Sequence, residues 1–475
     1  MKTSLLFAIA ALPVQTVVYA LARPNTNDGP RVLGLETQRR APRNPTHRDK
    51  LRKRGTLEVG LDNEETLYFI NGTVGTPPRE VRLHIDTGSS DLWVNTPSSS
   101  FCSSRGSPCA YSGTYEANSS STYEYIASNF NISYVDGSGA TGDYVSDTVS
   151  FGSQTIDRLQ FGIGYSSTNG QGILGIGYPL NEVQVGRAGL PPYNNLPAQL
   201  VADGVIQSNA YSLWLNDLDA NTGNILFGGV DAEKYVPPLQ SLPIESTSGV
   251  HGEFMITLTN LQLNDQTLTG GSSTDPLAIA VLLDTGSSLT YLPDHLVSEL
   301  YTAVGAIYNA STNAAYVPCA LARSDPSARL RFTFTSPTIA VALDELVLDL
   351  VTASGARPVL DDGQTACLFG VAPAGEGTYV LGDTFLRSAY VVYDLENHEI
   401  AMASTRFNTT ATRVLEIGTG SEAVPGVTRV SDPVRATEGL RGLNASDSAG
   451  VRGVEGAWRA VLAGVVGVAV VMGVL

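Results

Sequence analysis

Short apolar segments separated by turn residues recur along most of the 475-residue chain. Many alternate apolar with polar positions, and most are bounded by Gly, Asn, Asp or Pro, which is the pattern of β-strands. Helical spacing is confined to a few short stretches, such as 195–204 and 293–308. The pattern therefore predicts a mostly β protein, with its clearest strands at 79–86, 130–135, 143–152, 209–215, 224–229, 329–334 and 388–403.

One strand pattern occurs twice. HIDTGSSDLW at 84–93 is nearly repeated as LLDTGSSLTY at 282–291. The first copy is followed by GILGIGY at 172–178 and the second by YVLGDTFL at 379–386, so each half has an acidic turn, a run of short strands, then two apolar residues and a Gly. A duplicated unit of this size predicts two related β lobes that face each other.

The repeated turn carries an aspartate at the end of an apolar run, Asp86 in the first copy and Asp284 in the second. Apolar neighbours disfavour the charged form of a carboxyl group. A single D-T-G sequence is explained by an aspartate that shapes its own turn. Two copies in facing lobes predict two carboxyls that cannot both ionise cheaply and that share a proton. Such a pair can activate water as a base and protonate a carbonyl as an acid.

Other catalytic classes lack support in the sequence. No usable G-x-S-x-G motif or strand–helix alternation indicates a serine hydrolase. The proposed acid–base chemistry needs no metal or other cofactor, and the chain has no H-E-x-x-H motif. Its five histidines are scattered, at His47, His84, His251, His295 and His398.

The N-terminus combines one Lys, an apolar stretch and small residues at Ala20 and Ala22, which is typical of a signal peptide over 1–22. Residues 23–54 differ in chemistry, because they are rich in Arg and Pro and end in KLRKR. We expect a pro-segment that is cut after Arg54, with a disordered basic linker as the alternative.

Charge separates this leader from the rest of the chain. Residues 23–54 hold ten basic and three acidic residues, a net of +7, whereas the chain from Gly55 holds 18 basic and 43 acidic residues, a net of −25. The two parts attract each other until they are cut apart, which favours a zymogen. The acidic body also excludes nucleic acid as the expected partner.

If the signal peptide directs secretion, the four cysteines enter an oxidising compartment in which disulfides form. Of the three possible pairings, only Cys102 with Cys109 and Cys319 with Cys367 leaves the two halves unlinked, and we expect these two disulfides. Six N-x-S/T acceptors agree with secretion and glycosylation, at Asn71, Asn118, Asn131, Asn309, Asn408 and Asn444.

The C-terminus ends in a 16-residue apolar run, 460–475, after small residues and a polar spacer. A spanning helix needs about 20 apolar residues. The arrangement predicts a GPI-attachment signal over 449–475, removed on attachment at Ser448 or Asn444. A short transmembrane anchor is the alternative. The stretch before it, 408–448, has no clear period and is expected to be a Ser/Thr/Gly-rich tether.

The motifs from about Leu67 to Phe407 resemble those of pepsin-family aspartic endopeptidases. DTGSSDLWV, ISYVDGSGATGDYVSDTV, GILGIG, LLDTGSS and YVLGDTFLRSAYVVYDLENHEIAMA occur in the order found in that family. With the dibasic pro-segment and the C-terminal signal, the chain is similar to the fungal yapsin-like, surface-anchored branch. The resemblance implies an all-β, bilobal fold, with an N-terminal lobe at 55–240 and a C-terminal lobe at 241–407.

The resemblance also implies roles for particular residues. Asp86 and Asp284 match the catalytic pair. Thr87 and Thr285 match threonines that bond across the lobes, and Gly88 and Ser89 belong to the first loop. Tyr134 matches the tyrosine of a flap that closes over bound peptide. The remaining matches are Trp93, the hydrogen-bonding partner of that tyrosine, and Gly286, Ser287 and Ser288, the segment along the substrate backbone.

The flap departs from the pepsin pattern in length, and Asp136, followed by Gly137, lies near its tip. Flaps of yapsin-like enzymes carry an acidic residue there, so Asp136 is a candidate for a preference for basic substrate residues. An aspartate that only shapes the turn is the alternative. His84 shares a strand face with Asp86, which favours packing over tuning of the Asp86 pKa.

These predictions combine into a secreted, monomeric aspartic endopeptidase that binds peptides as extended strands. It is expected at the cell surface, on the plasma membrane through a GPI anchor or in the cell wall. The competing hypothesis is an inactive pepsin-like fold that only binds peptides or inhibitors. Such a protein is expected to have lost an Asp, the flap Tyr or a neighbouring Gly, all of which this chain retains at Asp86, Asp284, Tyr134, Gly88 and Gly286.

Overall fold

The computed structural model describes most of the predicted globular part of the chain. Strands make up 44% and helices 11% of the structure, which confirms the mostly β prediction. The predicted signal peptide, the GPI signal, Asp136, Asn444 and Ser448 lie outside the described residues, which are 30–39, 67–134, 137–220, 222–271, 276–310, 313–350 and 356–440.

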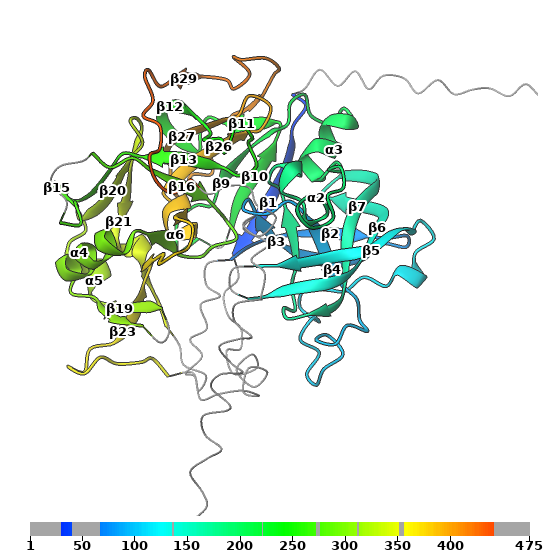
Figure 1. The fold of residues 1–475 in the computed structure, drawn as a ribbon, viewed down its shortest axis with the longest axis horizontal. Helices are drawn as coiled ribbons and strands as arrows, with labels where there is room; N and C mark the ends of the chain where they lie inside the picture. Colours follow the sequence, from blue (N-terminus) through cyan, green and yellow to red (C-terminus); the bar gives the residue numbers. More distant parts are fainter. Residues whose placement is uncertain are drawn as a thin grey trace, which may run out of the picture.

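A continuous sheet joins the two lobes. It contains 14 strands in the order β29-β12-β27-β26-β9-β10-β1-β2-β3-β8-β4-β7-β6-β5. Its central strands lie between the lobes in Figure 1: β12 (Tyr235–Pro243), β27 (Glu399–Thr405), β26 (Ala389–Asp394), β9 (Ala210–Trp214), β10 (Thr222–Phe227) and β1 (Leu33–Arg39). Here Tyr211 stacks on Tyr393 at 5.0 Å, and Phe254 meets Tyr393 edge to face at 4.7 Å. Aromatic packing therefore fills the junction between the lobes.

In the N-terminal lobe the GILG segment forms a strand between the two strands that flank the first acidic turn. β8 is parallel to β3 and antiparallel to β4, so the Asp86 turn emerges beside it. The elements of this lobe are β2 (Tyr68–Val74), β3 (Arg79–Asp86), β4 (Leu92–Asn95), η2 (Ala117–Ser119), β5 (Glu124–Ser133), β6 (Gly139–Phe151), β7 (Gln154–Ser167), β8 (Gly172–Gly175), η3 (Pro179–Asn181), α2 (Val183–Ala188) and α3 (Leu196–Ala202).

The C-terminal lobe repeats this arrangement. β25 (Val380–Leu381) lies parallel to β16 (Ile279–Leu283) and antiparallel to β17 (Thr290–Leu292). The internal repeat seen in the sequence is thus a repeat of strand topology. The other elements are β13 (Met255–Leu258), β14 (Asn260–Leu263), β15 (Gln266–Thr267), α4 (Asp294–Val304), β18 (Ile307–Asn309), β19 (Ala314–Pro318), α5 (Leu321–Ser324), β20 (Arg329–Thr333), β21 (Thr338–Ala342), η4 (Leu343–Leu346), β22 (Val347–Leu348), β23 (Ala366–Phe369), β24 (Val371–Pro373) and α6 (Asp383–Leu386).

The two predicted helices form but are shorter than expected. The stretch 293–308 gives α4 only up to Val304, because Gly305 adopts φ +68° and ends the helix in the left-handed region. Residues 307–309 then form strand β18. The stretch 195–204 gives α3, with Pro197 in its first turn.

Residues 408–440 form a C-terminal strap on the globular body, although the sequence predicted a tether there. β28 (Val414–Glu416) pairs with β11 (Gly229–Asp231), and β29 (Val427–Arg429) pairs with β12. Ile417, Ala423 and Val424 are buried against the body. These few apolar anchors lie between polar residues without a regular spacing, so the sequence shows no periodicity that would indicate packing.

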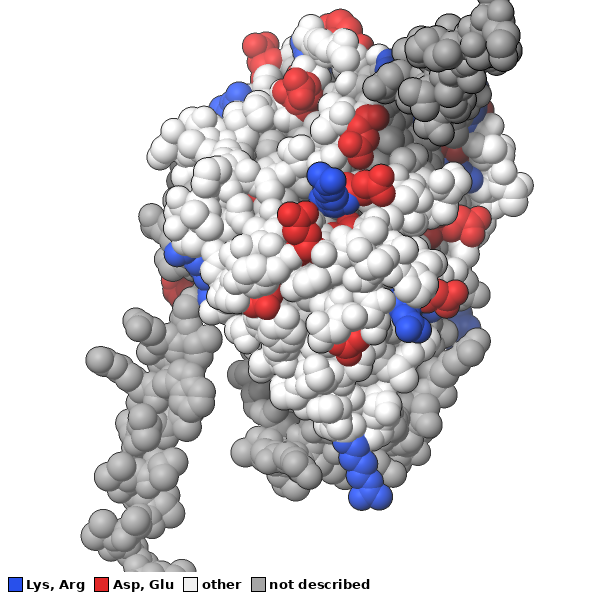
Figure 2. All heavy atoms as spheres, turned by 90° about the vertical axis from the view of Figure 1, so that its right-hand side faces the viewer, with Lys and Arg blue, Asp and Glu red and all other residues white. Residues whose placement is uncertain are grey.

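The described cysteines form the two disulfides expected, Cys102–Cys109 and Cys319–Cys367. The five described glycosylation sequons are exposed, with Asn71, Asn118, Asn131, Asn309 and Asn408 on the surface. Figure 2 shows the right-hand side of Figure 1 as mostly uncharged, with acidic side chains scattered among fewer basic ones. Within the described ranges, no helix is both long and apolar enough to cross a membrane.

Candidate active site

The two acidic turns meet between the lobes. Asp86 is the last residue of β3, and Asp284 directly follows β16. Both side chains are buried. Each turn therefore presents its carboxyl group from the end of a strand whose position is fixed by the neighbouring sheet.

The two carboxyl groups are held by the same local hydrogen bonds. Gly88 N–H donates to Asp86 Oδ1 at 2.9 Å, and Gly286 N–H donates to Asp284 Oδ1 at 2.8 Å. The second oxygen of each carboxyl accepts a serine hydroxyl, from Ser89 for Asp86 and from Ser287 for Asp284. The repeated D-T-G-S sequence thus sets the orientation of both carboxyls.

The glycines are required by the opposite aspartate. A Cβ atom on Gly88 would lie 2.5 Å from Asp284 Oδ1, and one on Gly286 would lie 2.5 Å from Asp86 Oδ1. Real Cβ atoms do not approach other atoms so closely. Only glycine at these positions lets each loop approach the aspartate of the opposite lobe this closely.

Two threonines lock the loops together. Thr87 N–H donates to Thr285 Oγ1 at 3.1 Å, and Thr285 N–H donates to Thr87 Oγ1 at 3.0 Å. Each hydroxyl then donates across the lobes, Thr87 to Leu283 O and Thr285 to Ile85 O, both at 2.9 Å. This closed set of four bonds fixes the separation of the two aspartates.

Burial shifts the protonation of the aspartate pair. Burial, followed by the nearby Asp86 charge, raises the pKa of Asp284 to about 7. Burial also raises the pKa of Asp86, although hydrogen bonds from Ser89, Asp284 and the Gly88 backbone oppose the rise. The pair therefore retains one proton in acidic solution up to near neutrality, as expected for interacting carboxyls.

Tyr134, the expected flap tyrosine, is tied to β4, the strand that follows the N-terminal loop. Trp93 Nε1–H donates to Tyr134 Oη at 2.8 Å, and Trp93 is fully buried. Gly137, at the described end of the flap turn, has φ +80° and no atom within 4 Å of an added Cβ. The structure thus brings Tyr134 and Trp93 together as expected, whereas Asp136 lies outside the described residues.

The C-terminal loop is more open than the N-terminal one. Gly88 and Ser89 are buried, whereas Gly286 is exposed and Ser287 and Ser288 are half-buried. The carbonyl oxygens of Ser287 and Ser288 accept the N–H groups of Asp383 and Thr384, at 2.9 and 3.2 Å. The segment expected to contact substrate is therefore accessible and tied to α6.

His84 contacts the opposite lobe. Its Nε2 lies 3.1 Å from Thr285 O, and its ring lies 5.7 Å from that of Phe69. It therefore links β3 to the second acidic loop, a role that strand periodicity alone does not indicate.

Sequence reasoning missed a buried acidic cluster behind the N-terminal loop. Asp91 Oδ1 accepts the hydroxyls of Tyr144 and Tyr193 at 2.6 and 3.0 Å, and its Oδ2 accepts Val183 N–H at 2.8 Å. Burial raises the pKa of Asp91 and raises that of its neighbour Glu182 to about 10. The sequence does contain an indication of this cluster, because Asp91 is a charged residue directly before the apolar end of DTGSSDLW.

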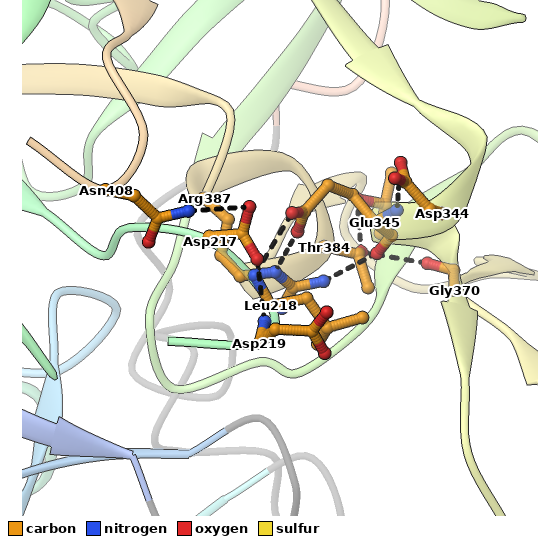
Figure 3. A network of polar contacts seen from close by, with 10 residues as sticks. Asp217, Leu218, Asp219, Asp344, Glu345, Gly370, Thr384, Arg387 and Asn408 are labelled. Carbon is orange, nitrogen blue, oxygen red and sulfur yellow. Dashed lines mark hydrogen bonds and ion pairs between the residues drawn. The ribbon is translucent and has the colours of Figure 1, made fainter. Parts of the chain in front are cut away.

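A buried ion pair lies behind the C-terminal loop (Figure 3). Arg387 Nε donates to Glu345 Oε2, and Arg387 Nη2 donates to Glu345 O at 2.6 Å. Glu345 Oε1 also accepts Leu218 N–H at 3.1 Å, so the ion pair is connected to the loop after β9. Asp383 is fully buried nearby, and burial raises its pKa well above the usual range, opposed by the Arg387 charge. No local sequence pattern places Glu345 beside Arg387.

Among the described residues, one group of potential metal ligands comes together: Cys319, Asp349 and Cys367. Both cysteines are joined in a disulfide, so their sulfur atoms do not offer thiolates.

The geometry defines the class of an aspartic-type hydrolase, with two buried carboxyl groups that face each other between the lobes. Comparison with known sequences agrees, because residues 67–405 match the family model of the eukaryotic aspartyl proteases. The chain belongs to this family, and it is an aspartic-type endopeptidase.

Individual relatives support the same assignment. The chain is 53% identical over 437 residues to the probable aspartic-type endopeptidase opsB of Aspergillus oryzae, covering 91% of this chain and 88% of that protein. It is 32% identical to aspartic proteinase 3 of Saccharomyces cerevisiae, covering 77% and 74% of the two chains. The crystal structure of the aspartic proteinase from Irpex lacteus shares the fold, with a TM-score of 0.56, 23% identity and coverage of 73% and 97%.

Proposed function

We propose that Asp86 and Asp284 hydrolyse peptide bonds by activating a water molecule between them. One carboxylate accepts a proton from the water, while the protonated partner donates a proton to the carbonyl oxygen of the scissile bond. The observation that carries this proposal is that the two buried carboxyls face each other, since a Cβ on Gly286 would lie 2.5 Å from Asp86 Oδ1 and 3.0 Å from Asp284 Oδ1. Burial and the Asp86 charge raise the pKa of Asp284 to about 7. Such a pair holds both an acid and a base at acidic pH.

Substrate is proposed to bind as an extended strand between the flap and the C-terminal loop. The exposed Gly286 and the half-buried Ser287 and Ser288 leave backbone groups accessible on one side. Tyr134, held by Trp93, is proposed to contact the peptide from the other side. An extended peptide can use its backbone N–H and C=O groups against such a segment, in the manner of an added strand.

The test is single replacement of each aspartate by asparagine, which keeps size and removes the titrating group. Asp86→Asn and Asp284→Asn are each expected to lower kcat for a peptide substrate by about 10³-fold or more. Circular dichroism and thermal unfolding check that both variants remain folded. Normal turnover by either folded variant rules out this mechanism.

We also propose that the chain is made as a zymogen, with cleavage after Arg54. Part of the basic leader supports this, because β1 (Leu33–Arg39) pairs with β10 and β2 in the sheet between the lobes. Replacing Lys53 and Arg54 by alanine is expected to leave the leader attached and to lower activity. N-terminal sequencing of the secreted product checks where the chain is cut. A mature N-terminus at Gly55 in the double variant contradicts the proposed site.

Secretion and surface anchoring form a further part of the proposal. The predicted signal peptide, the two disulfides and the five exposed sequons support passage through the secretory pathway. A relative, from Candida albicans, is named a secreted aspartic protease. GPI attachment at Ser448 or Asn444 is expected to make the enzyme releasable by a GPI-specific phospholipase. A chain truncated after Leu440 serves as the comparison and is expected in the medium.

A preference for basic residues near the cleavage site is proposed for Asp136. A carboxylate near the tip of the flap attracts Lys and Arg side chains of bound peptide. Asp136→Ala is expected to reduce selection of basic residues in a peptide library by about fivefold to tenfold. Asp157→Ala is a suitable control, because Asp157 is an exposed carboxylate on β7 of the same lobe. Unchanged profiles for Asp136→Ala leave only a turn role for this residue.

A further inference from the structure

A polar cavity lies among residues that play no part in the aspartate site. Its volume is about 490 Å³, and three segments line it: the chain after β12, the hairpin between β26 and β27, and the C-terminal strap. The polar side chains that face it are those of Glu245, Ser246, His251, Asn397, His398 and Arg435.

Two histidines from different segments stack in this cavity. The ring centroids of His251 and His398 are 4.0 Å apart, and the planes are inclined by only 11°. His398 occupies the hairpin turn with φ +55°, and its carbonyl oxygen accepts Ile244 N–H at 2.9 Å. Its Nδ1 lies 3.0 Å from Tyr178 Oη. The backbone and Tyr178 therefore fix the position of one ring, and the other lies flat against it.

The carboxylates around the cavity are already engaged. Glu245 accepts the Thr257 hydroxyl at 2.6 Å and pairs with Arg435 at 3.4 Å. Asp394 is bonded by the backbone and side-chain nitrogens of Asn397, at 3.0 and 2.7 Å. Glu399 pairs with Arg429 at 2.9 Å, and Glu396 is exposed on the hairpin. Glu245, Asp394 and Glu399 are thus each engaged by a group other than the two imidazole rings.

Protonation at acidic pH changes the charge of the cavity. Burial, followed by the His398 and Arg435 charges, lowers the pKa of His251. Both main charges that act on this ring are thus cationic. A protonated His251, stacked at 4.0 Å on the His398 ring and near the Arg435 guanidinium, is repelled by these neighbours. An anion bound among these groups removes the repulsion and accepts charge-assisted hydrogen bonds.

We propose that the cavity between His251, His398 and Arg435 is a binding site for a small oxyanion that fills at acidic pH. The ligand is an oxyanion with more than one negative charge, either inorganic, such as sulfate or phosphate, or the carboxylates of a small organic acid. Imidazolium and guanidinium N–H groups are the donors, and a volume of about 490 Å³ admits either source. This site is separate from the proposed peptidase chemistry and does not depend on it.

Binding of sulfate to the full chain tests the proposal. Sulfate keeps both its charges across the pH range used, so a pH effect on affinity comes from the protein. Isothermal titration calorimetry is carried out at pH 4.5 and pH 7, with chloride at equal ionic strength as the reference. We expect sulfate to bind about tenfold or more tightly at pH 4.5, because protonation of His251 adds a favourable charge. Oxalate, most of which carries two charges at pH 4.5, distinguishes an organic from an inorganic ligand in a parallel titration.

The variants separate the cavity from general surface charge. His398→Asn keeps a residue that tolerates positive φ, and Arg435→Gln keeps length without charge. Each is expected to weaken sulfate binding about tenfold. Arg413→Gln is the matched control, since it removes a cation from the same strap whose partner, Glu233, does not line the cavity and stays paired with Arg406. It is expected to leave sulfate affinity unchanged. Peptide cleavage and thermal unfolding in chloride check that all three variants are folded.

Two results overturn the proposal. One is sulfate binding no stronger than that of chloride at pH 4.5 in the wild-type chain. The other is equal sulfate affinity in wild type, His398→Asn and Arg435→Gln, which places the bound anion elsewhere. If His398→Asn does not fold, His251→Gln replaces it, because His251 lies outside the hairpin turn.

Discussion

The two acidic loops share a sequence and a local hydrogen-bond pattern but differ in what lies behind them. In the N-terminal lobe, Asp91 follows the D-T-G-S-S sequence and is bonded by two tyrosine hydroxyls and a backbone N–H. The second loop has Leu289 at that position. In the C-terminal lobe the buried acid is instead Asp383, where the first lobe has Ile176.

The supports of the two loops therefore use different chemistry. The N-terminal loop depends on several neutral donors that surround one carboxyl group. The C-terminal loop lies next to Asp383 and the buried ion pair between Arg387 and Glu345, which crosses from α6 to η4 (Figure 3). The comparison teaches that the repeated motif sets the geometry of the carboxyls, while the buried charged groups behind the two loops differ from lobe to lobe.

Removing one partner of the ion pair is expected to have the largest effect. Arg387→Met leaves Glu345 and Asp383 buried without their cation and should cost about 3–5 kcal/mol of unfolding free energy. In the N-terminal lobe, Tyr144→Phe removes one of three donors to Asp91 and should cost about 1–2 kcal/mol. Urea unfolding measures both. The double variant Arg387→Met with Glu345→Gln should lose less unfolding free energy than Arg387→Met alone. Equal losses of unfolding free energy in Arg387→Met and Tyr144→Phe would refute the contrast between the lobes.

The glycines test whether the two loops are equivalent at the dyad. Gly88→Ala and Gly286→Ala each place a methyl group against the aspartate of the other lobe. Displacement of a catalytic group by about 1 Å costs about 100-fold in rate, so each variant should lose about that much kcat. Gly418→Ala, where an added Cβ has no neighbour closer than 4.0 Å, is the control. A loss of kcat in only one of the two variants shows that one loop can shift to accommodate the methyl group and the other cannot.

Replacing Ser89 or Ser287 should have a smaller effect, which appears as a shift in the pH profile of kcat/KM. Both shifts should be towards higher pH, one on the acidic limb and one on the alkaline limb. With the pKa of Asp284 near 7, kcat/KM should fall above about pH 7 as the shared proton is lost. The Ser287 bond lowers the pKa of Asp284, so Ser287→Ala should move this alkaline limb upward by about half to one pH unit. The Ser89 bond lowers the pKa of Asp86, so Ser89→Ala should move the acidic limb upward.

Ser288→Ala is the control for the serine variants, because the bonds described at the two carboxyls come from Ser89 and Ser287 rather than from Ser288. Its pH profile should match that of the wild type. A Ser287→Ala profile that moves only on the acidic side would reverse the roles assigned to the two aspartates.

Several features of the fold follow from local sequence. The segments 79–86 and 388–403 have alternating or continuous apolar residues between turn residues. Both form strands as expected, the first as β3 and the second as β26 and β27. The internal repeat predicts that Asp86 and Asp284 meet, because each motif supplies only half of a site. The cysteine spacing also predicts the two disulfides.

Other features depend on contacts between distant segments. Strand β1 and the C-terminal strap pack because strands distant in the chain present edges with which they pair. The burial of Glu345, which lies 42 residues before Arg387, depends on how η4 and α6 meet. Charged residues are usually exposed, so sequence alone favours a surface position for both.

The sequence by itself determined the class of chemistry, since two D-T-G-S motifs in related halves specify a pair of carboxyls and the glycines that let them approach. The tertiary structure alone decided how the carboxyls share a proton, which groups are buried behind each loop, and that His251 stacks on His398. Motifs act through local backbone geometry, which is encoded by neighbouring residues. Burial and charge coupling depend on separations between segments far apart in the chain, and only folding fixes those distances.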